Sequence, residues 1–155
     1  MLAFNRGNKT KRPFMNILLV EDDVAVSASL TGIIRRWGYQ VETADTCKNA
    51  LMKVRENRFD LVLLDIFLPD GKGHELMPSI RELWPTLGVV TMTGYNSREL
   101  EMEVRKQGIP YHMIKPFDTK CLKELLDHIS YKCHQKENNE IDSQVRKEMI
   151  KRWQK

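Results

Sequence analysis

The stretch Leu61-Val-Leu-Leu-Asp-Ile-Phe-Leu-Pro-Asp-Gly-Lys-Gly73 decides the fold of this chain, because it joins a run of aliphatic residues to a polar loop. A short, almost continuous apolar run is typical of a strand that is buried on both faces, as in a parallel sheet. The run itself covers residues 59–64, similar runs occur at residues 17–20, 87–92 and 111–114, and a weaker strand signal lies at residues 39–44. Together these stretches give five candidate strands.

Amphipathic stretches typical of helices separate these runs. Gly38 is a plausible C-cap of the first, Thr46 a plausible N-cap of the second, and Pro78 must lie in the first turn of the third. Strands alternating with helices predict an α/β fold with a doubly wound parallel sheet. Right-handed crossovers then bring the carboxyl ends of all strands to one edge of the sheet, where such folds have their sites. The predicted helices are residues 24–37, 47–57, 76–84, 97–107 and 119–133.

The net charge of +4 belongs to the ends of the chain and not to its middle. Residues 1–16 carry four Lys/Arg and no acids, and residues 132–155 carry seven Lys/Arg and four acids. Residues 17–131 then hold 14 bases and 17 acids, so the predicted domain is slightly acidic. A basic face for nucleic acid is therefore not indicated, although the ends could attract polyanions.

Cysteine usage and hydropathy favour a cytoplasmic protein without a membrane segment. Cys47, Cys121 and Cys133 lack the spacing of a metal or redox motif, and their odd number argues against a disulfide framework. No run approaches the roughly 18 apolar residues that a membrane span needs. The polar, basic N-terminus lacks the apolar core of a signal peptide.

Polar residues follow the apolar runs at four places: Glu21-Asp22-Asp23, Asp65, Thr93 and Lys115-Pro116. A single acid after a strand usually caps a helix or faces solvent, and a lone Thr or Lys there is commonplace. Their joint occurrence at one predicted edge of a sheet favours a functional site.

Four motifs resemble the signatures of response-regulator receiver domains: ILLVEDD at residues 17–23, LVLLDIFLPDGKG at 61–73, VVTMTG at 89–94 and MIKPF at 113–117. The likeness covers about residues 16–131, and the full set in this order is highly specific. It implies a flavodoxin-like sheet of strand order 2-1-3-4-5. In that order the first strand neighbours the third, so Asp22 and Asp65 can face each other.

The acidic residues predict a site for a divalent cation. Two carboxylates about 4 Å apart repel each other by about 4 kcal/mol at an effective dielectric constant of 20, so they share protons or bind a cation. A few hard oxygen ligands with room for water favour Mg²⁺, with Mn²⁺ as an alternative. The resemblance implies that Asp22, Asp65 and the carbonyl of Phe67 bind the metal directly and that Glu21 acts through water. Asp23 is expected to be the N-cap of the first helix instead.

The resemblance further implies that Asp65 accepts a phosphoryl group from a sensor histidine kinase or a phosphotransfer protein. Lys115 would pair with Asp65 at rest and with a phosphoryl oxygen afterwards, and Thr93 would donate its hydroxyl to another oxygen. Pro116 is expected to follow a cis peptide bond. Such a protein is a signalling phosphoacceptor and not an enzyme, since it catalyses only its own phosphorylation and dephosphorylation.

Two features depart from the family's pattern or add to it. The switch aromatic of the family lies three residues before the lysine, where this chain has His112, with Tyr111 one residue earlier. Either His112 serves as the switch residue or the coupling uses different groups, and in the second case His112 can be a mere surface residue of an edge strand. Phe67 and Tyr95 stand two positions after Asp65 and Thr93, and we expect these aromatic side chains to shield the acyl phosphate from water.

The chain is predicted to comprise a flexible basic arm (residues 1–15), a receiver domain (residues 16–133) and a C-terminal tail (residues 134–155). The tail is too short for a DNA-binding domain, but beyond a polar break at residues 135–140 it carries an apolar stripe typical of an amphipathic helix. It could pack on the receiver, pair with a second chain, seat a partner or be a linker. An output partner or a homodimer would use residues 96–131 and this tail. The stripe consists of Ile141, Val145, Met149, Ile150 and Trp153.

Three other functions compete with this one. A haloacid-dehalogenase-type phosphatase needs a second acid two residues after its nucleophile, where this chain has Phe67. A flavodoxin-like cofactor binder needs a phosphate loop after the first strand, where the acids 21–23 would repel phosphate. A receiver used only as a binding module, without phosphorylation, stays the main alternative.

Overall fold

The computed structural model describes residues 15–153 and confirms the predicted α/β fold. Five parallel strands form one sheet in the order β2-β1-β3-β6-β7, the flavodoxin-like order, because β6 and β7 are the fourth and fifth long strands. The strands are β1 (Asn16–Val20), β2 (Gln40–Ala44), β3 (Leu61–Asp65), β6 (Gly88–Thr93) and β7 (Tyr111–Ile114). The helices are α1 (Val24–Arg36), α2 (Cys47–Glu56), α3 (Met77–Leu83), α4 (Arg98–Lys106) and α5 (Thr119–Trp153).

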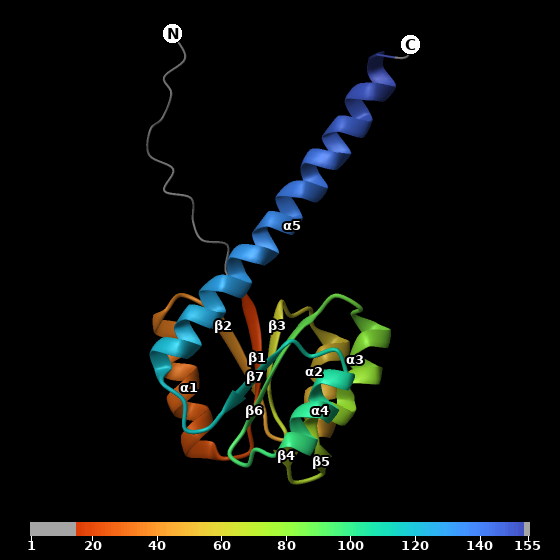
Figure 1. Cartoon of the computed structure of the whole chain (residues 1–155). Coiled ribbons are helices and arrows are strands. Elements are labelled where there is room, and N and C mark those ends of the chain that lie inside the picture. Colours follow the sequence, from red (N-terminus) through yellow and green to blue (C-terminus); the bar gives the residue numbers. More distant parts are fainter. Residues whose placement is uncertain (1–14, 154–155) are drawn as a thin grey trace. The chain divides into compact units, whose positions relative to one another are not determined.

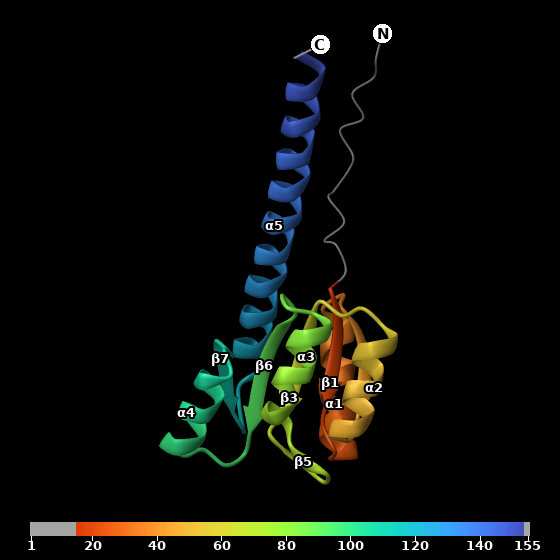
Figure 2. The same cartoon turned by 90° about the vertical axis from the view of Figure 1, so that its right-hand side faces the viewer.

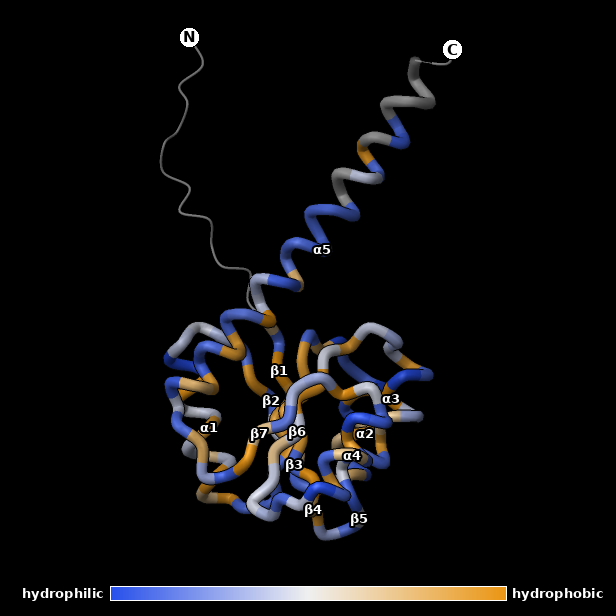
Figure 3. The backbone as a smooth tube through the Cα atoms, in the orientation of Figure 1, coloured by the Kyte–Doolittle hydropathy of each residue, from blue (hydrophilic) through white to orange (hydrophobic). Residues whose placement is uncertain are grey.

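The central strands are buried on both faces, as the apolar runs predict. Successive residues of a strand point to opposite faces, yet all five residues of β3 are buried. Helix α1 covers one face of the sheet, and α2, α3 and α4 cover the other (Figure 1). The hydropathy colouring shows the strands as the apolar interior between more polar helices (Figure 3). Among the described residues, no helix is both long and apolar enough to cross a bilayer.

Side chains at the helix ends explain why the helices begin where they do. The Asp23 carboxylate accepts hydrogen bonds from the backbone N–H groups of Ala25 and Val26, so its predicted N-cap role is confirmed. The Thr46 hydroxyl accepts one from the N–H of Asn49, which confirms the second predicted cap. Gly38, after α1, has φ of +93°, a left-handed conformation that suits a glycine after a helix.

The segment between Asp65 and α3 folds into short elements that the sequence did not predict. A two-residue hairpin, β4 (Phe67–Leu68) and β5 (Gly71–Lys72), leads into a 3₁₀ turn at Gly73–Leu76 (Figure 2). The N–H of Gly73 donates to the carbonyl of Ile66 at 2.7 Å, which closes the hairpin. Asp65, the candidate phosphoacceptor, therefore lies directly before a tightly folded loop.

The predicted helical extension at the C-terminus is present, but the predicted polar break is wrong. The chain divides after Asp118 into two compact units, and in the second α5 runs without interruption through residues 135–140. Gln, Lys and Glu are good helix formers, so a polar composition does not end a helix that faces water. Within α5, Gln135 donates to the hydroxyl of Tyr131 at 2.7 Å. Val145 is exposed, and the other four residues of the stripe lie outside the residues whose side chains the structure describes.

Candidate functional site at the carboxyl edge of the sheet

The parallel strands bring the predicted residues to one edge of the sheet. Glu21 and Asp22 directly follow β1, Asp65 ends β3, Thr93 ends β6, and Lys115 directly follows β7. Backbone hydrogen bonds continue past the strand ends and fix these positions. The N–H of Lys115 donates to the carbonyl of Thr93 at 2.7 Å, and that of Glu21 donates to the carbonyl of Ala44 at 2.9 Å.

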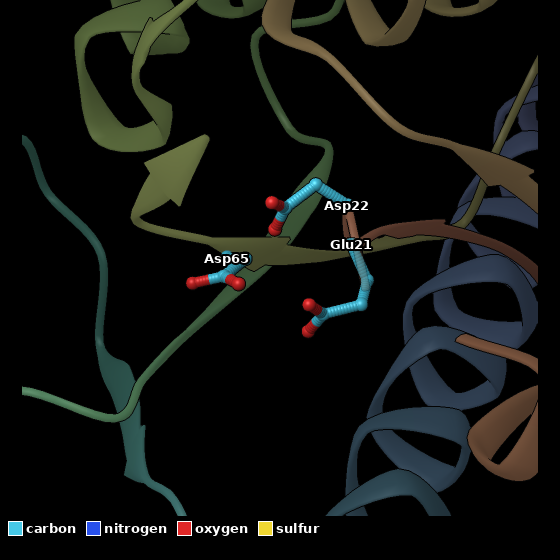
Figure 4. Close-up of side chains that lie close together, drawn as sticks. All are labelled: Glu21, Asp22 and Asp65. Atoms are coloured by element: carbon cyan, nitrogen blue, oxygen red, sulfur yellow. The ribbon is translucent and has the colours of Figure 1, made fainter. Parts of the chain in front are cut away.

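Three carboxylates form a cluster at this edge. Glu21, Asp22 and Asp65 each offer an oxygen, and these three oxygens lie within 4.8 Å of one another (Figure 4). Glu21 and Asp65 are buried, with exposed fractions of 4% and 6%, whereas Asp22 is exposed. Solvent and ligands can therefore reach the cluster from the side of Asp22.

Lys115 compensates part of this negative charge. Its Nζ pairs with Glu21 and lies 3.1 Å from Oδ2 of Asp65. Burial raises the pKa of Glu21, an effect that the hydrogen bond from Lys115 partly offsets. Burial alone would lower the pKa of Lys115, but the hydrogen bond to Glu21 and the charge of Asp65 outweigh it and raise that pKa. The ammonium group is thus held in its charged form between two carboxylates.

The donor set fits a hard divalent cation. The cluster places three carboxyl groups against a single ammonium group, so acidic groups outnumber basic ones at this edge. Oxygen ligands at a partly open site are what Mg²⁺ binds, since it keeps several of its waters. The described residues contain no other group of three metal-ligating side chains with such spacing.

Thr93 ends β6, and Phe67 and Tyr95 follow Asp65 and Thr93 by two residues. Thr93 is fully buried, and its hydroxyl donates to the carbonyl of Tyr95 at 2.8 Å and accepts from the N–H of Tyr95 at 3.1 Å. The rings of Phe67 and Tyr95 meet edge to face with centroids 6.2 Å apart. Both side chains are exposed, at 45% and 67%. The N–H of Phe67 donates to Oδ1 of Asp65 at 3.3 Å, which fixes one carboxylate oxygen.

His112 is half-buried on β7 and is engaged with the neighbouring strand. Its Nδ1 lies 2.8 Å from the hydroxyl of Thr91, which is also 3.4 Å from the carbonyl of Tyr111. The switch role of His112 and Tyr111 stays a prediction. Burial lowers the pKa of His112, and so does His74, while Glu101 opposes them.

The predicted cis bond before Pro116 is present.

Sequence reasoning missed four residues around the site. Thr91 lies opposite His112 in the register of β6 and β7, so strand pairing could have indicated it. Asp70, in the hairpin turn, accepts from the N–H groups of Cys47 and Lys48 at the start of α2. His74 reaches Glu103 on α4, 29 residues away, at 3.1 Å. No local pattern signals these last two contacts.

Comparison with known proteins agrees with this geometry. The model of the response regulator receiver domain family matches residues 17–127. The transcriptional regulatory protein ZraR of Escherichia coli (strain K12) is 37% identical over 113 residues, which are 73% of this chain and 26% of ZraR. The chain thus spans about a quarter of the length of the curated relatives it matches.

Solved structures match over most of the chain. A CheY-like response regulator receiver domain protein from Methanospirillum hungatei JF-1 has a TM-score of 0.76 and 32% identity, covering 79% of this chain and 98% of that one. The beryllofluoride-activated NtrC4 receiver domain dimer has a TM-score of 0.71 and 29% identity, covering 76% and 97%. With the family model matching most of its length, this chain belongs to the response regulator receiver domain family of two-component systems.

Proposed function

We propose that this chain accepts a phosphoryl group on Asp65 from a sensor histidine kinase or a phosphotransfer protein, in a reaction that depends on Mg²⁺. The observation that carries the proposal is the contact of Lys115 with both Glu21 and Asp65, beside the exposed Asp22. A buried carboxylate held by a lysine next to a cation site is placed to attack phosphorus, because the repulsion between two anions is offset.

In the proposed reaction, an oxygen of Asp65 forms a bond to phosphorus, and the bond from phosphorus to the donor's nitrogen or oxygen breaks. Asp22, Asp65 and the carbonyl of Phe67 would hold Mg²⁺, with Glu21 acting through water, and the bound ion would supply charge compensation for the phosphoryl oxygens. Lys115 shifts from its carboxylate partners towards one phosphoryl oxygen. Hydrolysis of the acyl phosphate later restores the carboxylate and releases phosphate.

Thr93 is the residue through which we expect phosphorylation to be sensed. To donate to a phosphoryl oxygen, its hydroxyl must give up the 2.8 Å hydrogen bond to the carbonyl of Tyr95. That exchange would change the loop after β6. We infer that His112, with Tyr111 beside it on β7, responds by altering its contact with Thr91.

The partners and the location follow from the same proposal. We expect the chain to meet its kinase in the cytoplasm. The output partner, or a second copy of the chain, would contact residues 96–131 and the C-terminal helix. ZraR is named a transcriptional regulatory protein, but this chain corresponds to only 26% of it, and we expect no direct DNA contact by residues 15–153.

Intact mass after incubation with acetyl phosphate and Mg²⁺ tests the proposal. We expect the mass to increase by one phosphoryl group in the unaltered chain and no increase in Asp65→Asn or when a chelator removes Mg²⁺. Asp45→Asn is the matched control, because Asp45 is an exposed acid outside the cluster, and it should be phosphorylated normally. If the unaltered chain gains no mass with any small donor or kinase, the phosphorylation-independent binding module becomes the better function.

A further inference from the structure

Helix α4 is held to its unit by few contacts. Among its nine residues the buried ones are Leu100 and Val104, which belong to the hydrophobic core. Met102 is 51% exposed, so it adds little. An element with so little buried apolar surface opens more easily than the rest of a domain. One additional contact can therefore decide how firmly α4 is held.

His74 supplies such a contact from the loop that follows Asp65. Its side chain is buried, and its Nε2 lies 3.1 Å from Oε2 of Glu103 on α4, whose side chain is 51% exposed. Nδ1 of His74 is buried without a hydrogen-bond partner, so the contact with Glu103 is the one hydrogen bond of this imidazole among the described residues. Burying a histidine whose ring nitrogens lack hydrogen bonds costs free energy, and the hydrogen bond between Nε2 and Glu103 reduces this cost.

Backbone packing ties His74 to Asp65. A Cβ atom on the preceding residue, Gly73, would lie 2.1 Å from the carbonyl oxygen of Asp65, so the two backbones are in direct contact. The N–H of Gly73 also donates to the carbonyl of Ile66 at 2.7 Å. Close-packed groups transmit displacements instead of absorbing them. A shift at Asp65 therefore moves Gly73 and, with it, His74.

We propose that His74 and Glu103 form a latch that holds α4 at rest and couples it to the loop of Asp65. This inference rests on the proposed function, because the phosphorylation of Asp65 would supply the signal that reaches the His74–Glu103 contact. It uses residues of the loop after β3 and of α4, which differ from those of the path through Thr93 and His112. Phosphorylation would displace His74 and thereby change the strength of its hydrogen bond to Glu103 on α4.

Hydrogen–deuterium exchange of the unphosphorylated protein tests how strongly the His74–Glu103 contact stabilises α4. In His74→Leu and in Glu103→Gln, we expect amides of residues 98–106 to exchange about five- to tenfold faster, as for the loss of one hydrogen bond. The double variant should show no further increase, because both changes remove the same contact. Glu99→Gln, an acid-to-amide change at an exposed position in the first turn of the same helix, loses only the interaction of its charge with the helix dipole and should speed exchange about twofold or less. Glu103→Gln alters no core residue, so it remains informative if His74→Leu folds poorly.

The same measurement with beryllofluoride and Mg²⁺, which mimic the phosphoryl group, tests the coupling. In the unaltered chain we expect exchange of α4 to change on binding, and in Glu103→Gln at least half of this change to be lost. Uptake of the phosphoryl group from acetyl phosphate should stay normal in Glu103→Gln. Unchanged α4 exchange in both resting variants, or an equal response in the variant and the unaltered chain, would overturn the latch. Failure of the unaltered chain to take up phosphoryl would contradict the proposed function instead, and the resting experiment would still decide whether the latch exists.

Discussion

At the scale of single residues, His112 makes the stability of the domain depend on pH. Burial and His74 lower its pKa below the ordinary value of 6.5, and Glu101 opposes this shift. The folded state therefore favours the neutral imidazole. Below about pH 6.5 the unfolded chain binds a proton that the folded chain does not yet bind, so the free energy of unfolding falls as the pH decreases.

His112→Gln removes this titration. We expect the free energy of unfolding, from urea titrations between about pH 8 and pH 5, to fall more for the unaltered chain than for the variant. The other three histidines are common to both proteins, so the difference between the two curves reports His112. Parallel curves over the whole range would show that His112 is not buried in its neutral form.

A second prediction for single residues concerns Phe67 and Tyr95. Their rings meet edge to face with centroids 6.2 Å apart, and because the two residues follow Asp65 and Thr93 closely in sequence, we expect them to limit the access of water to an acyl phosphate on Asp65. We expect Phe67→Asn and Tyr95→Glu to shorten the half-life of the phosphorylated protein, measured as loss of the added mass after the donor is removed. Tyr131→Glu, an equally exposed aromatic on α5, is the control. Half-lives equal to that of the unaltered chain would exclude shielding.

At the scale of elements, Asp70 joins the β4–β5 hairpin to α2. Its carboxylate accepts from the N–H groups of Cys47 at 2.8 Å and Lys48 at 3.0 Å, and these hydrogen bonds lower its pKa. We expect Asp70→Ala to loosen the hairpin, which carries Phe67, and therefore to weaken Mg²⁺ binding. Thr46→Ala removes a cap from the same helix without touching the hairpin, so its Mg²⁺ affinity should stay normal. Calorimetric titration with Mg²⁺ distinguishes the two, and equal affinities would contradict the role of Asp70.

The elements also show how far the sequence could predict the structure. Strands such as β3 are continuous apolar runs, and caps such as Asp23 and Thr46 are local signals, so both could be read from neighbouring residues. The contacts of Asp70 with α2 and of His74 with Glu103 join distant segments, and they depend on a hairpin whose strands are only two residues long. Such contacts arise from tertiary packing. The polar break failed for a different reason, since exposed helices tolerate polar sequence.

At the scale of the whole molecule, the chain consists of a unit with the candidate site and a unit formed by one helix. The first unit ends at Asp118, and α5 then continues for 35 residues to Trp153. The family match ends at residue 127, so most of α5 lies beyond it. A helix of this length with a repeated apolar stripe needs a surface to bury that stripe.

We expect that surface to be a second copy of the chain, so that α5 supports self-association. Val145 is 48% exposed and belongs to the stripe, and a charge there would have to be buried in a helix pair. Val145→Glu should weaken self-association by about tenfold or more, a loss of about 1.4 kcal/mol. Gln144→Glu adds the same charge at the neighbouring exposed residue and should have little effect. Sedimentation velocity over a concentration series, with and without beryllofluoride and Mg²⁺, measures both the association and its dependence on the site. A chain that sediments as an 18.2 kDa monomer under all conditions would exclude self-association through the stripe.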